Sequence, residues 1–180
     1  KRFVQVTNPR YHVKCGKTMG GGKLDKVHEN LTQDVKDELT RDLKDVEAIT
    51  FTTDGWTAPN GDPFISLSVQ YITADFQLKC IALDIQNFNE RHSAANIRGA
   101  FDEMVGKYEA INANKLTKYC VTDAANNMRA AMCKASEATK INEHLSCIAH
   151  IFNTCLRHAC DKQPAIGELI QKCKQLARKT

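Results

Sequence analysis

Two stretches of this chain decide its fold: Ile49-Thr50-Phe51-Thr52-Thr53-Asp54-Gly55-Trp56 and Tyr119-Cys120-Val121-Thr122-Asp123. Both are rich in β-branched and aromatic residues, which favour strands, and both run into an aspartate. Two strand-end carboxylates on neighbouring strands could share divalent metal ions, because Mg²⁺ prefers oxygen ligands. The alternative is that each aspartate only forms a turn, since Asp tolerates turn geometry.

The composition is that of an ordinary globular protein. Its 180 residues are 42% hydrophobic and 26% charged, which suits one domain with a possible appendage. No apolar run is long enough to cross a bilayer, so we expect no membrane partner. The net charge is +4, and basic residues gather near the two ends, where they could follow a phosphate backbone or simply be solvated.

Hydrophobic periodicity predicts an α/β protein with an N-terminal amphipathic helix. Residues 1–22 read as a loop that ends in three glycines, and a helix then follows to about residue 46. Strands are expected at 48–57, 64–73, 78–86, 116–122 and 145–149, and helices at 93–108, 125–138, 150–160 and 164–178. The order from residue 48 is β-β-β-α-β-α-β-α.

Short motifs in this chain resemble those of the hAT superfamily of DNA transposases and their domesticated BED-finger relatives. Four segments carry the resemblance, with a fifth, weaker one at His92-Ser93-Ala94-Ala95-Asn96-Ile97. The four are Asn8-Pro9-Arg10-Tyr11-His12-Val13, Thr52-Thr53-Asp54-Gly55-Trp56-Thr57, Val121-Thr122-Asp123-Ala124-Ala125-Asn126-Asn127-Met128 and Cys147-Ile148-Ala149-His150-Ile151-Phe152-Asn153.

The resemblance implies a ribonuclease H-like mixed sheet in which the first and fourth strands lie side by side. It implies that Asp54 and Asp123 are the first two acids of a DDE triad that holds Mg²⁺ or Mn²⁺. The activity would be metal-dependent DNA strand cleavage and transfer in the nucleus, with transposon ends and target DNA as partners. A homo-oligomer is expected for the full-length protein.

The third acid of that family, a glutamate, lies downstream of a large helical insertion. We therefore expect residues 1–47 to form a loop and long helix, and 48–180 to be the N-terminal part of the catalytic core. This part alone is expected to be inactive. One departure is Ala124, because the family usually has asparagine directly after the second aspartate.

Cys147 and His150 match the C-x-x-H motif, which in such proteins lies near the carboxylates and is thought to position DNA. With Cys155 and His158 they could instead be zinc ligands, but His150 through His158 read as one helix. Four ligands from one helix are poorly placed for a tetrahedron, so zinc is not expected. A buried cysteine and a helix-capping histidine are a third interpretation.

Two further expectations concern side chains around the strands. Cys80 and Cys120 lie in apolar strand-like runs and Trp56 follows Asp54, so all three are expected to be buried. No chemistry is assigned to His92 or Asn96.

Two rival functions remain open. A domesticated hAT-derived protein would bind DNA or partners without transposing, and Ala124 favours it mildly. An ordinary ribonuclease H-type nuclease would need all its carboxylates within this span, and the C-x-x-H segment argues against it.

Overall fold

A computed structural model of the protein describes residues 22–113, 115–133 and 139–177. The chain divides into two compact units, residues 1–42 and 43–180. The first unit contains helix α3 (Lys23–Asp42), as its apolar periodicity predicts. The loop expected over residues 1–22 and the motif at residues 8–13 lie outside the described residues, apart from Gly22.

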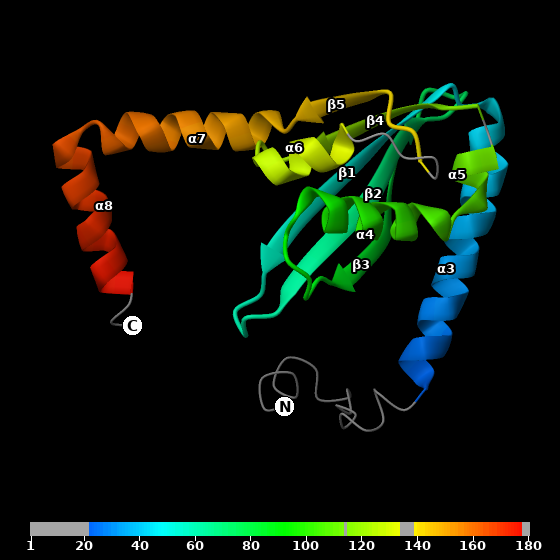
Figure 1. The fold of residues 1–180 in the computed structure, drawn as a ribbon, viewed down its shortest axis with the longest axis horizontal. Helices are drawn as coiled ribbons and strands as arrows, with labels where there is room; N and C mark the ends of the chain where they lie inside the picture. Colours follow the sequence, from blue (N-terminus) through cyan, green and yellow to red (C-terminus); the bar gives the residue numbers. More distant parts are fainter. Residues whose placement is uncertain (1–21, 114, 134–138, 178–180) are drawn as a thin grey trace. The chain divides into compact units, whose positions relative to one another are not determined.

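The second unit is an α/β domain built on one mixed sheet of five strands in the order β3-β2-β1-β4-β5 (Figure 1). This confirms the α/β class and the mixed sheet expected from the sequence. Its elements are η1 (Leu43–Asp45), β1 (Ala48–Thr57), β2 (Pro63–Ile72), β3 (Leu78–Asn87), α4 (Ala94–Gly106), α5 (Glu109–Ala113), β4 (Thr117–Thr122), α6 (Asn126–Met132), β5 (Glu143–Ser146), α7 (Ile148–Asp161) and α8 (Pro164–Ala177).

Three boundaries differ from those expected. The short helix α5 was not foreseen, and α6 ends at Met132, with residues 134–138 outside the described part of the chain. Strand β5 spans Glu143–Ser146 rather than 145–149. It stops there because its parallel partner β4 ends at Thr122, whose carbonyl accepts a hydrogen bond from the Cys147 amide.

The sheet is antiparallel on one side and parallel on the other. β1 pairs antiparallel with β2, and β2 with β3, whereas β1–β4 and β4–β5 are parallel. The β1–β2 turn uses Gly61 at φ +93°, a left-handed conformation that glycine adopts without steric cost. The polypeptide between β3 and β4 forms α4 and α5, the crossover that parallel pairing requires.

Helices α4, α5 and α6 supply the apolar residues that cover one face of the sheet. Phe51 of β1 and Phe101 of α4 meet edge to face, with ring centroids 5.3 Å apart, and both are fully buried. Ser93 caps α4 as predicted, because its side chain accepts the Asn96 amide hydrogen bond. The other buried core residues on these elements include Ile49, Ile65, Leu67, Val69, Ile97, Met104, Val105, Ile111, Cys120, Met128 and Met132.

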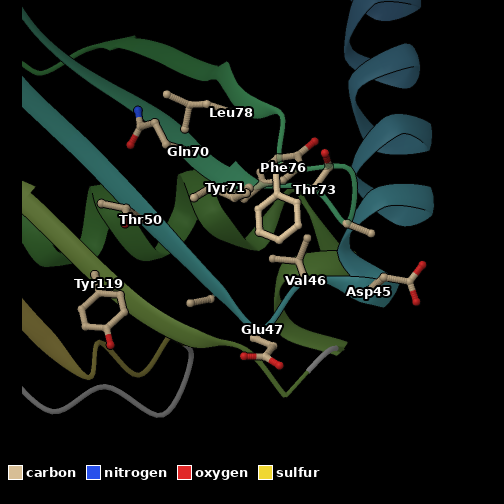
Figure 2. Close-up of a pocket in the computed structure, with 13 residues that line it drawn as sticks. Asp45, Val46, Glu47, Thr50, Gln70, Tyr71, Thr73, Phe76, Leu78 and Tyr119 are labelled. Atoms are coloured by element: carbon tan, nitrogen blue, oxygen red, sulfur yellow. The ribbon is translucent and has the colours of Figure 1, made fainter.

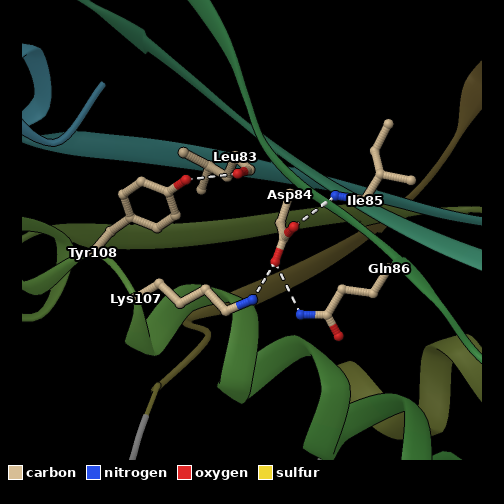
Figure 3. Close-up of polar contacts among 6 residues, drawn as sticks. All are labelled: Leu83, Asp84, Ile85, Gln86, Lys107 and Tyr108. Atoms are coloured by element: carbon tan, nitrogen blue, oxygen red, sulfur yellow. Dashed lines mark hydrogen bonds and ion pairs between the residues drawn. The ribbon is translucent and has the colours of Figure 1, made fainter. Parts of the chain in front are cut away.

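A polar cluster ties the end of α4 to strand β3 (Figure 3). Lys107 Nζ lies 2.7 Å from the Asp84 carboxylate, which also accepts hydrogen bonds from the Ile85 amide and the Gln86 side chain. Burial raises the pKa of Asp84, but these interactions outweigh it and leave that pKa below its ordinary value. Tyr108 donates to the Leu83 carbonyl at 2.6 Å.

The opposite face of the sheet is polar along its centre. Its half-buried residues include Thr50, Thr52, Ser66, Ser68 and Gln70, and the Thr52 hydroxyl donates to Gln70 at 3.0 Å. Cys80 is exposed rather than buried, since strand alternation places it on this face, opposite Gln70. Among the described residues, no helix is long and apolar enough to cross a bilayer.

Candidate active site

Asp54 and Asp123 leave two adjacent parallel strands at the same step. The last paired residues of β1 and β4 are Thr52 and Val121, and each aspartate lies two positions beyond its own partner. Asp54 is exposed and Asp123 is half-buried. Equal register brings both backbones to one edge of the sheet, which is the arrangement expected for two carboxylates that act together.

Asp123 is held by a local turn. Its carboxylate Oδ1 accepts a hydrogen bond from the Ala125 amide at 3.1 Å, the i to i+2 pattern typical of an Asp-initiated turn. Helix α6 begins at the next residue. Ala124 lies exposed inside this turn, so its methyl group supplies no hydrogen bond beside the carboxylate.

A second group of contacts fixes the residue before Asp123. The Thr122 hydroxyl donates to the Asp123 carbonyl at 2.8 Å and lies 2.8 Å from Nε2 of His144 on β5. Burial, and then the nearby Arg129 charge, hold the pKa of His144 below its ordinary value. The neutral imidazole is therefore the form that the folded protein favours.

A cavity of about 210 Å³ adjoins Asp123. Its lining includes Gly55, His92, Asp123 and Asn127, with apolar residues from β2 and α4 behind them. Asn127 donates to the His92 carbonyl at 3.0 Å, which ties the start of α6 to the loop before α4. The His92 ring contacts Phe88, with ring centroids 5.1 Å apart.

His92 therefore lies beside a predicted site residue, although the sequence assigned it no chemistry. The available signal was its position in the weak fifth motif. Asn96 caps locally instead, donating to the Arg91 carbonyl. His144 carried no motif, since its relation to Thr122 depends on the β4–β5 register.

Cys147 and His150 stand at the β5–α7 junction. Cys147 is the residue that caps α7, is half-buried, and donates its amide hydrogen to the Thr122 carbonyl at 2.7 Å. That bond brings its backbone to the residue directly before Asp123. His150 is exposed in the first turn of α7, and the same helix continues through Cys155 and His158 as expected.

Trp56 differs from its prediction. It is 39% exposed and stacks on Phe64 across the β1–β2 ladder, with ring centroids 5.7 Å apart. Strand alternation puts it on the same face as Asp54, away from the helices, which explains why it is not in the core.

The donor set suits a hard divalent cation. Within the described residues, no group of three or more His, Cys, Asp or Glu side chains could hold a metal ion. The two aspartates supply oxygen ligands, the type that Mg²⁺ and Mn²⁺ prefer, and a further ligand would have to come from substrate, water or another residue.

A scan against models of protein families and a search of curated proteins both find no match for this chain.

Proposed function

We propose that this chain is part of a ribonuclease H-like catalytic core of an hAT-type DNA transposase. The observation that carries the proposal is the parallel pairing of β1 with β4 in a register that sends Asp54 and Asp123 to the same edge. The strand order and the antiparallel β1–β2–β3 meander are compatible with it. The motif resemblance at both aspartates supplies the functional class.

In this function Asp54 and Asp123 hold the metal ions. A bound divalent cation activates the attacking oxygen of a phosphodiester cleavage and stabilises the leaving oxygen. The protein contributes position: the Ala125 amide orients the Asp123 carboxylate, and Thr122 with His144 fixes the turn from which that carboxylate projects.

Cys147 and His150 are assigned to the DNA strand beside the carboxylates. The Cys147 amide bond to Thr122 keeps the N-terminus of α7 near the site, and the exposed His150 side chain is accessible to a phosphate. The partners of the full protein would be transposon ends and target DNA, bound by a homo-oligomer in the nucleus.

A second candidate is a domesticated relative that binds DNA without cutting it. Ala124 favours this candidate, because an asparagine at that position could hydrogen-bond near Asp123 and alanine cannot. Retention of both aspartates favours the enzyme.

The test for the metal site uses this chain. Mn²⁺ is titrated while amide resonances are followed, and we expect paramagnetic broadening centred on residues 53–55 and 122–125. Asp54→Asn and Asp123→Asn should each weaken it strongly, while Asp62→Asn, in the β1–β2 turn, should not. Broadening that is unchanged in both site variants would exclude a shared site.

The test for activity uses the natural protein that includes the region downstream of residue 180, where the resemblance places the third acid. Mg²⁺-dependent cleavage of DNA carrying its transposon ends should be lost in Asp54→Asn and Asp123→Asn. A protein that binds these ends but never cuts them would support the domesticated candidate.

A further inference from the structure

A cavity of about 540 Å³ lies at the opposite end of β1 and β4 from the aspartates (Figure 2). Its lining comes from residues 45–50, the β2–β3 hairpin and Tyr119 of β4, all within the 43–180 unit. This volume falls in the range of about 300–1,000 Å³ typical of ligand pockets. The cavity plays no part in the proposed chemistry.

Phe76 stands at the rim of this cavity in an unusual conformation. It has φ +58°, the left-handed region, and among the described residues it is the non-glycine residue with positive φ. The hairpin requires this conformation, because the Phe76 amide donates to the Thr73 carbonyl and the Thr73 amide to the Gln77 carbonyl. Glycine or asparagine would adopt it at lower cost, by roughly 1 kcal/mol.

The Phe76 ring gains no packing in return, since the residue is 90% exposed. Two other apolar residues beside it are also open to solvent: Ile72 is 59% exposed and Leu78 is 72% exposed. Both line the same cavity. Together, Ile72, Phe76 and Leu78 form an apolar rim that folding of the hairpin does not explain.

The charge around this rim has one sign. The charged residues that line the cavity are Asp45 and Glu47, and both are exposed. The floor is polar and uncharged, with Thr50, Gln70 and Tyr119. An apolar rim above a polar floor, with acids at one side, complements an apolar side chain flanked by cations.

We propose that this cavity, bounded by Ile72, Phe76, Leu78, Asp45 and Glu47, is a docking site for a protein segment that carries an apolar side chain flanked by lysine or arginine. The apolar side chain contacts the Phe76 and Leu78 side chains, and the basic neighbours face Asp45 and Glu47. This inference is independent of the proposed catalytic function, because no lining residue belongs to the candidate active site.

The probe is a short fluorescent peptide in which leucine and phenylalanine are flanked by lysines. Its binding to this chain is measured by anisotropy, and amide shifts map where it binds. We expect shifts at Gln70, Leu78 and Tyr119. Phe76→Asn, which tolerates the left-handed conformation, should weaken binding about tenfold, and Asp45→Asn with Glu47→Gln should weaken it and lower its salt dependence.

Two matched controls define specificity. Ile85→Thr removes another exposed apolar side chain from β3 outside the cavity, and it should leave binding unchanged. A peptide with glutamate in place of lysine should bind much more weakly. Equal binding of both peptides, or binding that Phe76→Asn leaves intact, would overturn the proposal.

Two other occupants are also distinguishable. If Phe76→Asn dissolves a concentration-dependent dimer and the peptide does not bind, the cavity is a self-association surface. If Phe76→Asn instead lowers the melting temperature strongly, the ring packs within the chain. Either result overturns the proposal.

Discussion

The Thr122 hydroxyl and the His144 Nε2 atom lie 2.8 Å apart, and the same hydroxyl donates to the Asp123 carbonyl. Because Thr122 gives its hydrogen to that carbonyl, His144 must donate from Nε2 to complete the contact. A side chain on β5 thus helps to hold the turn that presents a carboxylate on β4.

His144 should make the stability of the domain depend on pH. Its pKa is lower in the folded protein, through burial and then Arg129, than its ordinary 6.5. The unfolded chain therefore binds a proton first as the pH falls. The contribution of His144 is fully present above about pH 6.5 and is lost as the pH falls from there towards the folded pKa, with a slope of at most about 1.4 kcal/mol per pH unit.

Urea unfolding of the protein and of His144→Gln between pH 5 and pH 8, chosen as about one unit or more on each side of the ordinary value, isolates this term. The difference between the two curves should be flat above about pH 7 and should shrink below it. A difference that does not change with pH would contradict the assignment.

Cys120 should resist alkylation. It is fully buried on β4, and burial raises the pKa of its thiol to about 12 despite the nearby Arg98 charge. Because the thiolate is the reactive form, iodoacetamide at pH 8 should label the exposed Cys155 and Cys173 first. Labelling followed by peptide mass spectrometry gives the order, and Cys120 reacting at the rate of Cys155 would show that β4 opens locally.

The two phenylalanines Phe51 and Phe76 should respond oppositely to truncation. Phe51→Ala removes a buried ring that packs on Phe101, and it should cost about 3–5 kcal/mol of unfolding free energy. Phe76→Gly removes an exposed ring at φ +58° and should be neutral or stabilising by up to about 1 kcal/mol. Thermal or urea unfolding of both variants measures the contrast, and a large loss in Phe76→Gly would show unrecognised packing.

Mn²⁺ should raise the melting temperature if Asp54 and Asp123 share an ion. A ligand that binds only the folded state stabilises it by about 1.4 kcal/mol at ten times its dissociation constant. The shift should vanish in Asp54→Asn and persist in Asp62→Asn. The same shift in all three proteins would indicate weak binding elsewhere.

Much of the sheet was predictable because alternation along the strands is strong. The residues of β2 alternate between buried apolar and half-buried polar side chains, and this pattern located the strand to within one residue. The capping role of Ser93 was also readable, since it depends on contacts within one turn.

The exposure of Trp56 and Cys80 was not predictable from that pattern. Alternation shows that two faces exist, but the helices that cover one of them come from distant parts of the chain. The role of His144 was hidden for a related reason, because its contact with Thr122 exists only once β4 and β5 pair in register. Contacts between strands far apart in sequence leave no local signature.

The pairing of β1 with β4 also has a consequence for how the protein forms. The β1–β2–β3 meander is made of neighbours in sequence, whereas β4 reaches β1 only after the α4–α5 crossover has been synthesised. Long-range pairings of this kind form slowly, because loop closure must precede the contacts that reward it. The edge that carries both aspartates should therefore be assembled late, and a chain still emerging from the ribosome would hold Asp54 without its companion.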